Sequence, residues 1–207
     1  MELIDEHIAE FRNSALRDFS GSPPWELTSS STAIVERLLG GLGVDYAVNG
    51  NVACHLTSTI EEGAILKGPA IVGPKCFIGS GTLVRGGCWL EGNCILGPGA
   101  ELKSSFVFGG SKLAHFNFVG DSILGRGVNL EAGSIIANYR NEWADPTISF
   151  VYRGKRIGTG AEKFGALVGD RTRIGANAVI APGAVLAPDT IVKRLSLVDQ
   201  AVPTSSA

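Results

Sequence analysis

The sequence lacks several features that would indicate particular classes of protein. Its charge is nearly balanced, with a formal net charge of −2 at pH 7, so we expect neither nucleic acid nor a membrane surface as a partner. No unbroken apolar run approaches the roughly 18 residues of a membrane-spanning helix. Aromatic residues make up only 7%, whereas hydrophobic residues reach 44%. This composition excludes a disordered chain and predicts a core of small aliphatic side chains.

The N-terminus lacks the basic segment of a secretory signal. The first residues, MELIDEHIAEF, carry acidic but no basic side chains, so we expect a cytoplasmic protein. Four cysteines without a secretory signal favour free thiols in a reducing compartment. Cys76, Cys88 and Cys94 contain no C-x-x-C pair. We therefore expect them to pack as small apolar residues, and we expect no bound metal.

What the sequence has in abundance is glycine, at 28 positions, and a repeat of six residues. A small residue usually stands two places before each repeated apolar position, as Cys76, Cys88 and Cys94 do. The repeated apolar positions are Leu66, Val72, Ile78, Val84, Leu90, Leu96, Leu102 and Phe108, then Phe118, Leu124, Leu130 and Ile136, then Val168, Ile174, Ile180, Leu186 and Val192.

A period of six is typical neither of an α-helix nor of a single long strand, in which every second residue faces the same side. It fits a short strand followed by a turn, with one large and one small side chain pointing inward in each unit. Glycine supplies the turn conformations that a Cβ atom would oppose. The repeat therefore predicts an all-β fold, a parallel β-helix whose stacked coils bury a continuous aliphatic column.

Residues 1–47 lack the repeat. Their apolar residues follow helical spacing instead, as at Ile4, Ile8 and Phe11. We expect an N-terminal helical cap of two short helices that cover the open end of the β-helix, because terminal repeats need capping.

The β-helix itself is expected over residues 48–198. Residues 138–167 interrupt it, and the β-rich stretch from Thr147 to Tyr152, followed by a turn at 153–155, predicts an extruded hairpin. Long excursions from a rigid scaffold often carry function. Residues 199–207 are expected to form a flexible tail.

The period is also broken at SKLAHFNFVGDS, residues 111–122. The step from Phe108 to Phe118 is ten residues instead of six, as if four residues had been added. We expect residues 112–117 to leave the register of the core, which places His115 on a loop. One interpretation is a surface histidine without function, and the other is an imidazole that moves a proton near neutral pH.

Other polar residues recur near this histidine at coil spacing. Arg85 and Lys103 are eighteen residues apart, so they should stack on the same face of adjacent coils. His115, Asn129 and Asn138 follow at intervals compatible with the same edge. Two cations suit a phosphate and amides suit sugar hydroxyls, so the pattern predicts a cleft for a small anionic sugar.

The segment ELKSSFVFGGSKLAHFNFVGDSILGRGVNLEAGSIIANYR resembles the acetyltransferase half of bacterial bifunctional N-acetylglucosamine-1-phosphate uridyltransferase/glucosamine-1-phosphate acetyltransferases. It is more similar still to archaeal-type sugar-1-phosphate nucleotidylyltransferases, in which KFGALVGD, residues 163–170, has a counterpart. The similarity covers about residues 60–194, and its most specific parts are H-x-x-x-V-G-D and the later A-N-Y. It implies a single-stranded left-handed β-helix with three hexads per coil, hence about six coils for the seventeen repeated positions.

The resemblance also implies an activity: transfer of an acetyl group from acetyl-CoA to the amine of a sugar phosphate. His115 falls on the catalytic base, which takes the amine proton. Asn138 falls on a residue that orients the amine. Ala132 falls on a backbone position near the acyl-CoA thioester, and a backbone N–H would stabilise the oxyanion.

Further positions of the resemblance imply contacts with the substrate. Arg85 and Lys103 fall on ligands of the sugar phosphate, and Asn129 and Tyr139 on sugar- and phosphate-contacting positions. The resemblance further implies a homotrimer that binds CoA between adjacent subunits.

Two positions depart from the pattern. Phe118 replaces a tyrosine whose hydroxyl would bind phosphate, and Ala144 stands near the place of a lysine. Substitutes for that lysine are Arg140 or the hairpin cations Arg153, Lys155 and Arg156. The departures suggest another sugar, a nucleotide-linked sugar or lost activity.

Two further hypotheses remain open, and one activity is not expected. The chain could be a non-catalytic trimeric scaffold or sugar-nucleotide-binding protein. It could also be a γ-class carbonic anhydrase, which needs three histidine ligands for zinc, although only His7, His55 and His115 exist. The first 47 residues are too few for a nucleotide-binding domain and lack its glycine-rich motif, so we expect no nucleotidyl transfer.

Overall fold

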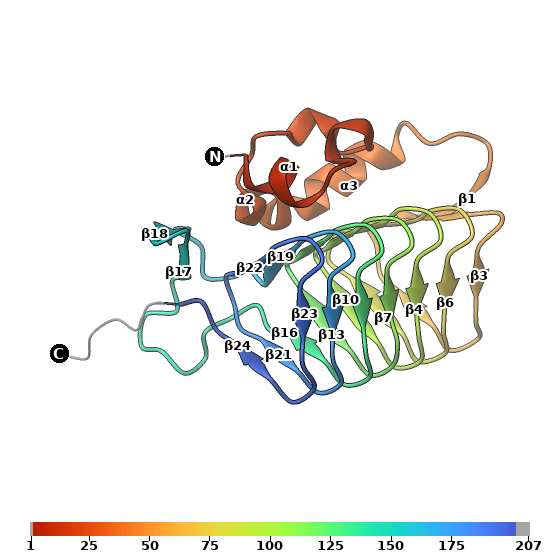
Figure 1. Ribbon diagram of the computed structural model, residues 1–207. Coiled ribbons are helices and arrows are strands. Elements are labelled where there is room, and N and C mark those ends of the chain that lie inside the picture. The colour runs from red at the N-terminus through yellow and green to blue at the C-terminus, as the bar shows by residue number, and fades with distance from the viewer. Residues whose placement is uncertain (1, 202–207) are drawn as a thin grey trace.

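The computed structural model describes residues 2–201, and its coils form a left-handed parallel β-helix with helices along one side (Figure 1). Most strands are only two or three residues long, as a six-residue repeat requires. Three parallel sheets, here sheets A, B and C, form the three faces of the prism.

Sheet A contains β1 (Tyr46–Asn49), β2 (Val52–His55), β5 (Ala70–Val72), β8 (Cys88–Leu90), β11 (Phe106–Val107), β14 (Ile123–Leu124), β19 (Ala166–Val168) and β22 (Ala184–Leu186). Sheet B contains β3 (Thr59–Ile60), β6 (Phe77–Ile78), β9 (Ile95–Leu96), β12 (Lys112–Leu113), β15 (Asn129–Leu130), β20 (Arg173–Ile174) and β23 (Ile191–Val192). Sheet C contains β4 (Ile65–Leu66), β7 (Leu83–Arg85), β10 (Glu101–Lys103), β13 (Phe118–Gly120), β16 (Ile135–Ile136), β21 (Val179–Ile180) and β24 (Leu197–Val198).

The predicted fold is confirmed, with one coil more than the repeat indicated. Sheets B and C have seven strands each, which gives seven coils instead of about six. The count was short because the repeat was recognised only from Leu66 to Val192, which leaves out Cys54 and Ile60 of the first coil and Val198 of the last. Within the three sheets of the described chain, only β1 is antiparallel to its neighbour, β2.

The column of inward side chains forms the main core. Val72 pairs with Leu90 on the next coil of sheet A, and Ile78 pairs with Leu96 on sheet B. The small positions fill the corners of the prism, and the predicted burial of the three repeat cysteines is confirmed, with exposures of 2% or less. The buried cysteines are Cys76, Cys88 and Cys94.

The predicted insertion after Phe108 is wrong. The inward residues of the fourth coil are Val107, Leu113 and Val119, all fully buried. A turn shortened by one residue before Val107, and another after Val119, breaks the period instead of four added residues. Residues 112–117 therefore stay in register with the core. Phe108 is buried outside the prism, in the second core described next.

The N-terminal helices lie along the outer face of sheet A (Figure 1), not across the open end of the prism as predicted. The reason is that sheet A carries large apolar residues on its outer side, such as Trp89 and Phe106, which need cover. The helices bury these residues against Ile4, Ile8 and Phe11 in a second core. The elements are α1 (Leu3–His7), η1 (Phe11–Asn13), η2 (Arg17–Phe19), α2 (Pro24–Ser29) and α3 (Ser31–Leu39).

The hairpin predicted within 138–167 is confirmed. Strands β17 (Ser149–Tyr152) and β18 (Lys155–Gly158) pair antiparallel around Arg153 and Gly154, whose φ angles of 49° and 73° are those of a tight two-residue hairpin turn. The hairpin lies near the last coils (Figure 1), where Phe150 joins the second core.

The predicted tail begins with ordered contacts. Asp199 pairs with Arg140, and the Gln200 side chain exchanges hydrogen bonds with the backbone of Val185. The prediction of a flexible tail is therefore wrong for residues 199–201, and the rest of it lies outside the described residues. Within residues 2–201, no helix has the length and apolar character needed to cross a membrane.

Candidate functional site

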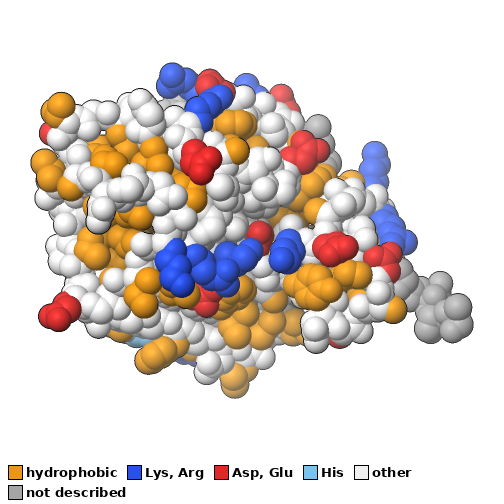
Figure 2. Space-filling view, turned by 180° about the vertical axis from the view of Figure 1, so that it is seen from behind, with side chains coloured by type: hydrophobic (Ala, Val, Ile, Leu, Met, Phe, Trp, Pro, Cys, Tyr) orange, Lys and Arg blue, Asp and Glu red, His pale blue; other side chains and the backbone are white. Residues whose placement is uncertain are grey.

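Basic side chains form a row across one face of the molecule (Figure 2). The predicted stacking of Arg85 and Lys103 is confirmed, since they pair at the ends of adjacent strands β7 and β10. Both residues stand where sheet C turns into sheet A. The Arg85 guanidinium already has a partner, because its Nε donates to Glu101 Oε1 at 2.8 Å.

Lys103 and Asn138 meet at a third residue, Asp121. Lys103 Nζ lies 2.6 Å from Asp121 Oδ2, and Asn138 Nδ2 donates to the same oxygen. The Asp121 side chain is only 8% exposed. The Asn138 amide lies directly over Gly120, where a Cβ atom would come within 2.8 Å of Asn138 Cγ. The glycine of the V-G-D motif therefore makes room for the amide.

The Phe118 ring borders this cluster. Its Cζ would lie 2.9 Å from a Cβ atom at Gly120, on the same side as Asn138. Phe118 is half-buried on the outer face of sheet C. The position that a hydroxyl would occupy in the resembled family therefore presents an apolar ring edge beside the Asn138 amide.

His115 lies at the other edge of sheet C, in the turn between β12 and β13. It is exposed, and its ring makes no hydrogen bond among the described residues. Strand β13 separates it from Asp121, a length of roughly 10 Å at about 3.3 Å per residue. The prediction that His115 and Asn138 share one edge within a chain is therefore wrong.

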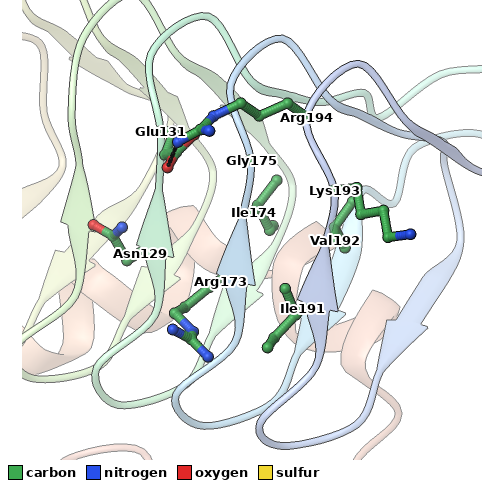
Figure 3. Close-up of a pocket in the computed structure, with 9 residues that line it drawn as sticks. All are labelled: Asn129, Glu131, Arg173, Ile174, Gly175, Ile191, Val192, Lys193 and Arg194. Atoms are coloured by element: carbon green, nitrogen blue, oxygen red, sulfur yellow. Dashed lines mark hydrogen bonds and ion pairs between the residues drawn. The ribbon is translucent and has the colours of Figure 1, made fainter.

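Asn129 lies on a different face from either residue. It stands half-buried on the outer side of β15 in sheet B, between Lys112 and Arg173. Here the surface is hollowed, with a volume of about 530 Å³ (Figure 3). The residues lining the hollow are Asn129, Glu131, Arg173, Ile174, Gly175, Ile191, Val192, Lys193 and Arg194.

An ion pair spans this hollow. Arg194 donates to both carboxylate oxygens of Glu131, at 2.7 and 2.8 Å, and passes over Gly175 on the intervening coil (Figure 3). This pairing lowers the pKa of Glu131. Ala132, the next residue, is exposed, and its N–H makes no hydrogen bond among residues 2–201. An unused backbone donor thus lies beside a basic hollow.

Arg140 is not available to replace the missing lysine, contrary to the sequence hypothesis. Its side chain is 1% exposed, and its Nη atoms donate to both oxygens of Asp199 at 2.7 and 2.8 Å. It also donates to the carbonyl of Pro182 at 2.9 Å. These bonds lower the pKa of Asp199. Tyr139, just before it, is 41% exposed.

Two of the three hairpin cations are engaged elsewhere in this chain, and the third, Lys155, is exposed. Arg153 pairs with Glu6 of the N-terminal segment at 2.9 Å, and Arg156 donates to Ser149 within its own hairpin at 3.3 Å. Neither contacts Asn138. Sequence reasoning gave Asp121 no role, although this residue closes the H-x-x-x-V-G-D motif, and it considered Arg140 only as a substitute for the missing lysine.

The three histidines are far apart in the fold. His7 is buried in α1, His55 lies on the first coil and His115 on the fourth. Among the described residues, no three His, Cys, Asp or Glu side chains come together as a metal site would require. The residue set that a γ-class carbonic anhydrase needs is not assembled in this part of the chain.

The coils and their repeat define a hexapeptide-repeat protein with the left-handed β-helix fold. The chain is 30% identical over 165 residues to a bifunctional sugar-1-phosphate nucleotidylyltransferase/acetyltransferase of Sulfurisphaera tokodaii, covering 77% of this chain and 41% of that protein. It is 26% identical over 199 residues to the bifunctional protein GlmU of Methanococcus vannielii, covering 88% and 44%. These similarities confirm the resemblance found in the sequence.

The chain spans less than half the length of these two relatives. Among solved structures, a hexapeptide transferase family protein from Anaplasma phagocytophilum shows 16% identity and a TM-score of 0.41, covering 73% of this chain and 80% of that one. No family model matches the chain.

Proposed function

We propose that the protein is an N-acetyltransferase that uses acetyl-CoA to acetylate an amino-sugar phosphate similar to glucosamine-1-phosphate. The observation that carries the proposal is the meeting of Lys103 and Asn138 at one buried carboxylate, with Arg85 one coil away. A cation pair beside an amide suits a phosphate next to an amino sugar. The similarity to relatives whose names include acetyltransferase supports the same activity.

In this proposal His115 is the general base. Its imidazole takes a proton from the amine as nitrogen attacks the thioester carbon, the new C–N bond forms and CoA leaves as the C–S bond breaks. The unused N–H of Ala132 is suited to stabilise the oxyanion. Asn138 orients the amine, while Arg85, Lys103, Asn129 and Tyr139 contact the sugar phosphate.

The separation of His115 from Asn138 supports a site shared between protomers of a homotrimer. Sheet A is covered by helices, whereas sheet C keeps an outer row with exposed apolar residues. If sheet C faces a threefold axis, the edge of sheet C that carries His115 in one protomer lies against the edge that carries Asn138 in the next protomer. His115 of one protomer then joins Lys103 and Asn138 of the next. The exposed apolar residues of sheet C are Ile65, Ile135 and Leu197.

The basic hollow on sheet B suits the phosphates of CoA. Arg173, Lys193 and Arg194 line it, and it adjoins Ala132, where the thioester would lie. Arginine and lysine are the usual partners of phosphate oxygens. The hollow therefore supports acetyl-CoA as the acyl donor.

The proposal is tested by measuring thiol release from acetyl-CoA across a panel of amino-sugar phosphates. We expect turnover with at least one of them, and His115→Ala should lower kcat by about 10²–10⁴-fold, as loss of a general base does. His55→Ala is the matched control, because His55 lies far away on the first coil. Activity unaffected by His115→Ala would refute the assigned base.

One observation favours the non-catalytic alternative. Arg85 and Lys103 are each already paired with a carboxylate, and Phe118 offers no hydroxyl to a phosphate. A sugar-nucleotide-binding scaffold predicts saturable binding of the sugar ligand in calorimetry with no thiol release. Turnover by the unmodified protein would remove this alternative.

A further inference from the structure

We propose that Asp121 is a positioning residue that fixes the side-chain amide of Asn138 in one orientation, with its carbonyl oxygen turned toward the substrate amine. The inference rests on the proposed function, in which Asn138 contacts the amine. Asp121 itself touches no reacting atom and acts through Asn138.

The orientation follows from hydrogen-bond chemistry. A carboxylate can only accept hydrogen bonds, and Asp121 Oδ2 receives both Lys103 Nζ and Asn138 Nδ2. The amide must therefore turn its NH₂ group toward Asp121. Its carbonyl oxygen then faces away from the carboxylate. Because the Asp121 side chain is almost entirely buried, solvent competes little with this arrangement.

The Asp121 backbone is held as firmly as its side chain. Its N–H donates to the Lys103 carbonyl at 2.9 Å, and its own carbonyl accepts the N–H of Gly165 at 2.9 Å. Its φ angle of 46° is in the left-handed region, which a residue other than glycine adopts at a cost. Asp121 therefore links three segments. It bonds to Lys103 on the third coil, to Asn138 where the excursion begins and to Gly165 where the chain returns.

The fixed amide determines what the site can accept. A carbonyl oxygen takes an N–H from a neutral amine and thereby aims the nitrogen lone pair away from itself, toward the acyl group. If the amide were reversed, its NH₂ would compete for that lone pair. The carboxylate also offsets the charge of Lys103, so it limits how tightly the site holds a phosphate.

The test is the isosteric variant Asp121→Asn, whose new amide can donate as well as accept and lets Asn138 reverse. We expect kcat to fall about 10–100-fold, in line with a lost positioning contact. At the same time, calorimetry should show tighter binding of inorganic phosphate, because a negative charge beside Lys103 is gone. A purely structural role would weaken both, and an unchanged kcat would overturn the proposal.

Glu101→Gln shows how much of the change in phosphate binding comes from charge alone, since Glu101 pairs with Arg85 but contacts no amide. In the double variant Asp121→Asn with Asn138→Asp, the amide at position 121 donates a hydrogen bond to the carboxylate at position 138, so a single donor again faces a single acceptor. It should recover part of the kcat lost in Asp121→Asn. Lack of any recovery would contradict the orientation argument.

A readout without turnover separates this inference from the proposed function. The ¹⁵N–¹H resonances of the Asn138 NH₂ group, assigned by their loss in Asn138→Ala, should shift clearly in Asp121→Asn. If the unmodified protein turned over no amino sugar yet this shift and tighter phosphate binding occurred, the proposed function would fail while the orientation stood. Resonances that stay in place would overturn the orientation even in an active enzyme.

Discussion

The most buried charge in the described chain belongs to Arg140. Its side chain is 1% exposed and is held by Asp199, by the Pro182 carbonyl and by the ring of Trp143, 4.6 Å away. Arg140 therefore fastens the start of the excursion to the last coil. Because it directly follows Asn138 and Tyr139, this contact fixes the backbone at the candidate site.

Arg140→Leu should lower the free energy of unfolding by about 3 kcal/mol, because the buried side chain loses its hydrogen bonds to Asp199 and to the Pro182 carbonyl. Arg171→Leu is the matched control. Arg171 also forms a two-pronged pair, with Asp189, but both side chains are more than 60% exposed, so its loss should cost less than about 1 kcal/mol. Urea denaturation measures both. Equal losses would contradict the structural role of Arg140.

His7 gives the protein a pH-dependent stability. Burial lowers the pKa of His7 below 6.5, although the Leu3 carbonyl and the carboxylates of Glu6 and Asp170 oppose this shift, while Arg153 adds to it. The folded state therefore binds fewer protons than the unfolded state at acidic pH. Stability is present above pH 6.5 and is lost as pH falls toward the lowered pKa.

The expected result is a smaller free energy of unfolding at pH 5 than at pH 7.5. His7→Gln, which cannot take up a proton, should reduce this difference. His55→Gln serves as control, because His55 is only half-buried and, among residues 2–201, its ring hydrogen-bonds only to Thr57. Urea titrations at the two pH values measure the effect. The same slope in His7→Gln as in the unmodified protein would show that other groups control it.

At the scale of elements, the three faces of the prism are built from the same short strands, but only sheet A is covered by the N-terminal helices. Phe106 on sheet A and Phe118 on sheet C both point outward, but the first is fully buried under the helices and the second only half-buried. Outward phenylalanines on the two faces therefore contribute differently to stability.

Phe106→Ala should cost about 3–5 kcal/mol, as in an ordinary core, because a cavity opens between sheet A and the helices. Phe118→Ala should cost only about 1 kcal/mol in the isolated protomer. Thermal and urea unfolding at low protein concentration measure both. Similar losses would mean that sheet C is also covered.

The elements could be predicted where the repeat is regular and not where coil length changes. Six-residue spacing predicted the strands and the buried cysteines, because each inward position needs an apolar side chain. The six-residue spacing failed at the fourth coil, because Phe108 and Phe118 are apolar but point out of the prism. Cover by the helices was assigned to the wrong surface, since spacing alone does not distinguish outward residues that another element will bury.

At the scale of the whole molecule, the proposed site depends on assembly. Sedimentation should give a mass of about 65 kDa, three times the 21.6 kDa chain. Ile135→Lys places a charge on the outer face of sheet C and should yield monomers without acetyl transfer. Val48→Lys, at an exposed position of β1 outside the proposed site, is the matched control. Trimers that survive Ile135→Lys would place the contact on another face.

The site could be predicted only as separate groups. Coil spacing correctly stacked Arg85 on Lys103, because eighteen residues return the chain to the same edge. It did not show that His115 and Asn138 lie at different edges of sheet C. Two turns around the fourth coil are one residue short, so counting in sixes no longer tells at which edge a residue lies. The role of Asp121 depends on which side chains reach its carboxylate, which no periodicity contains.

The two ends of the excursion lie side by side: the Phe164 N–H donates to the Asn138 carbonyl at 3.1 Å. Residues 139–163 thus leave the prism and return to it at the same place. Residues could be added at the hairpin turn between Arg153 and Gly154 without disturbing the stacked coils, because Arg140 and Phe150 would keep their contacts and a longer loop between fixed neighbours adds little entropy cost. The same scaffold can then acquire new recognition segments while its rigid frame stays unaltered.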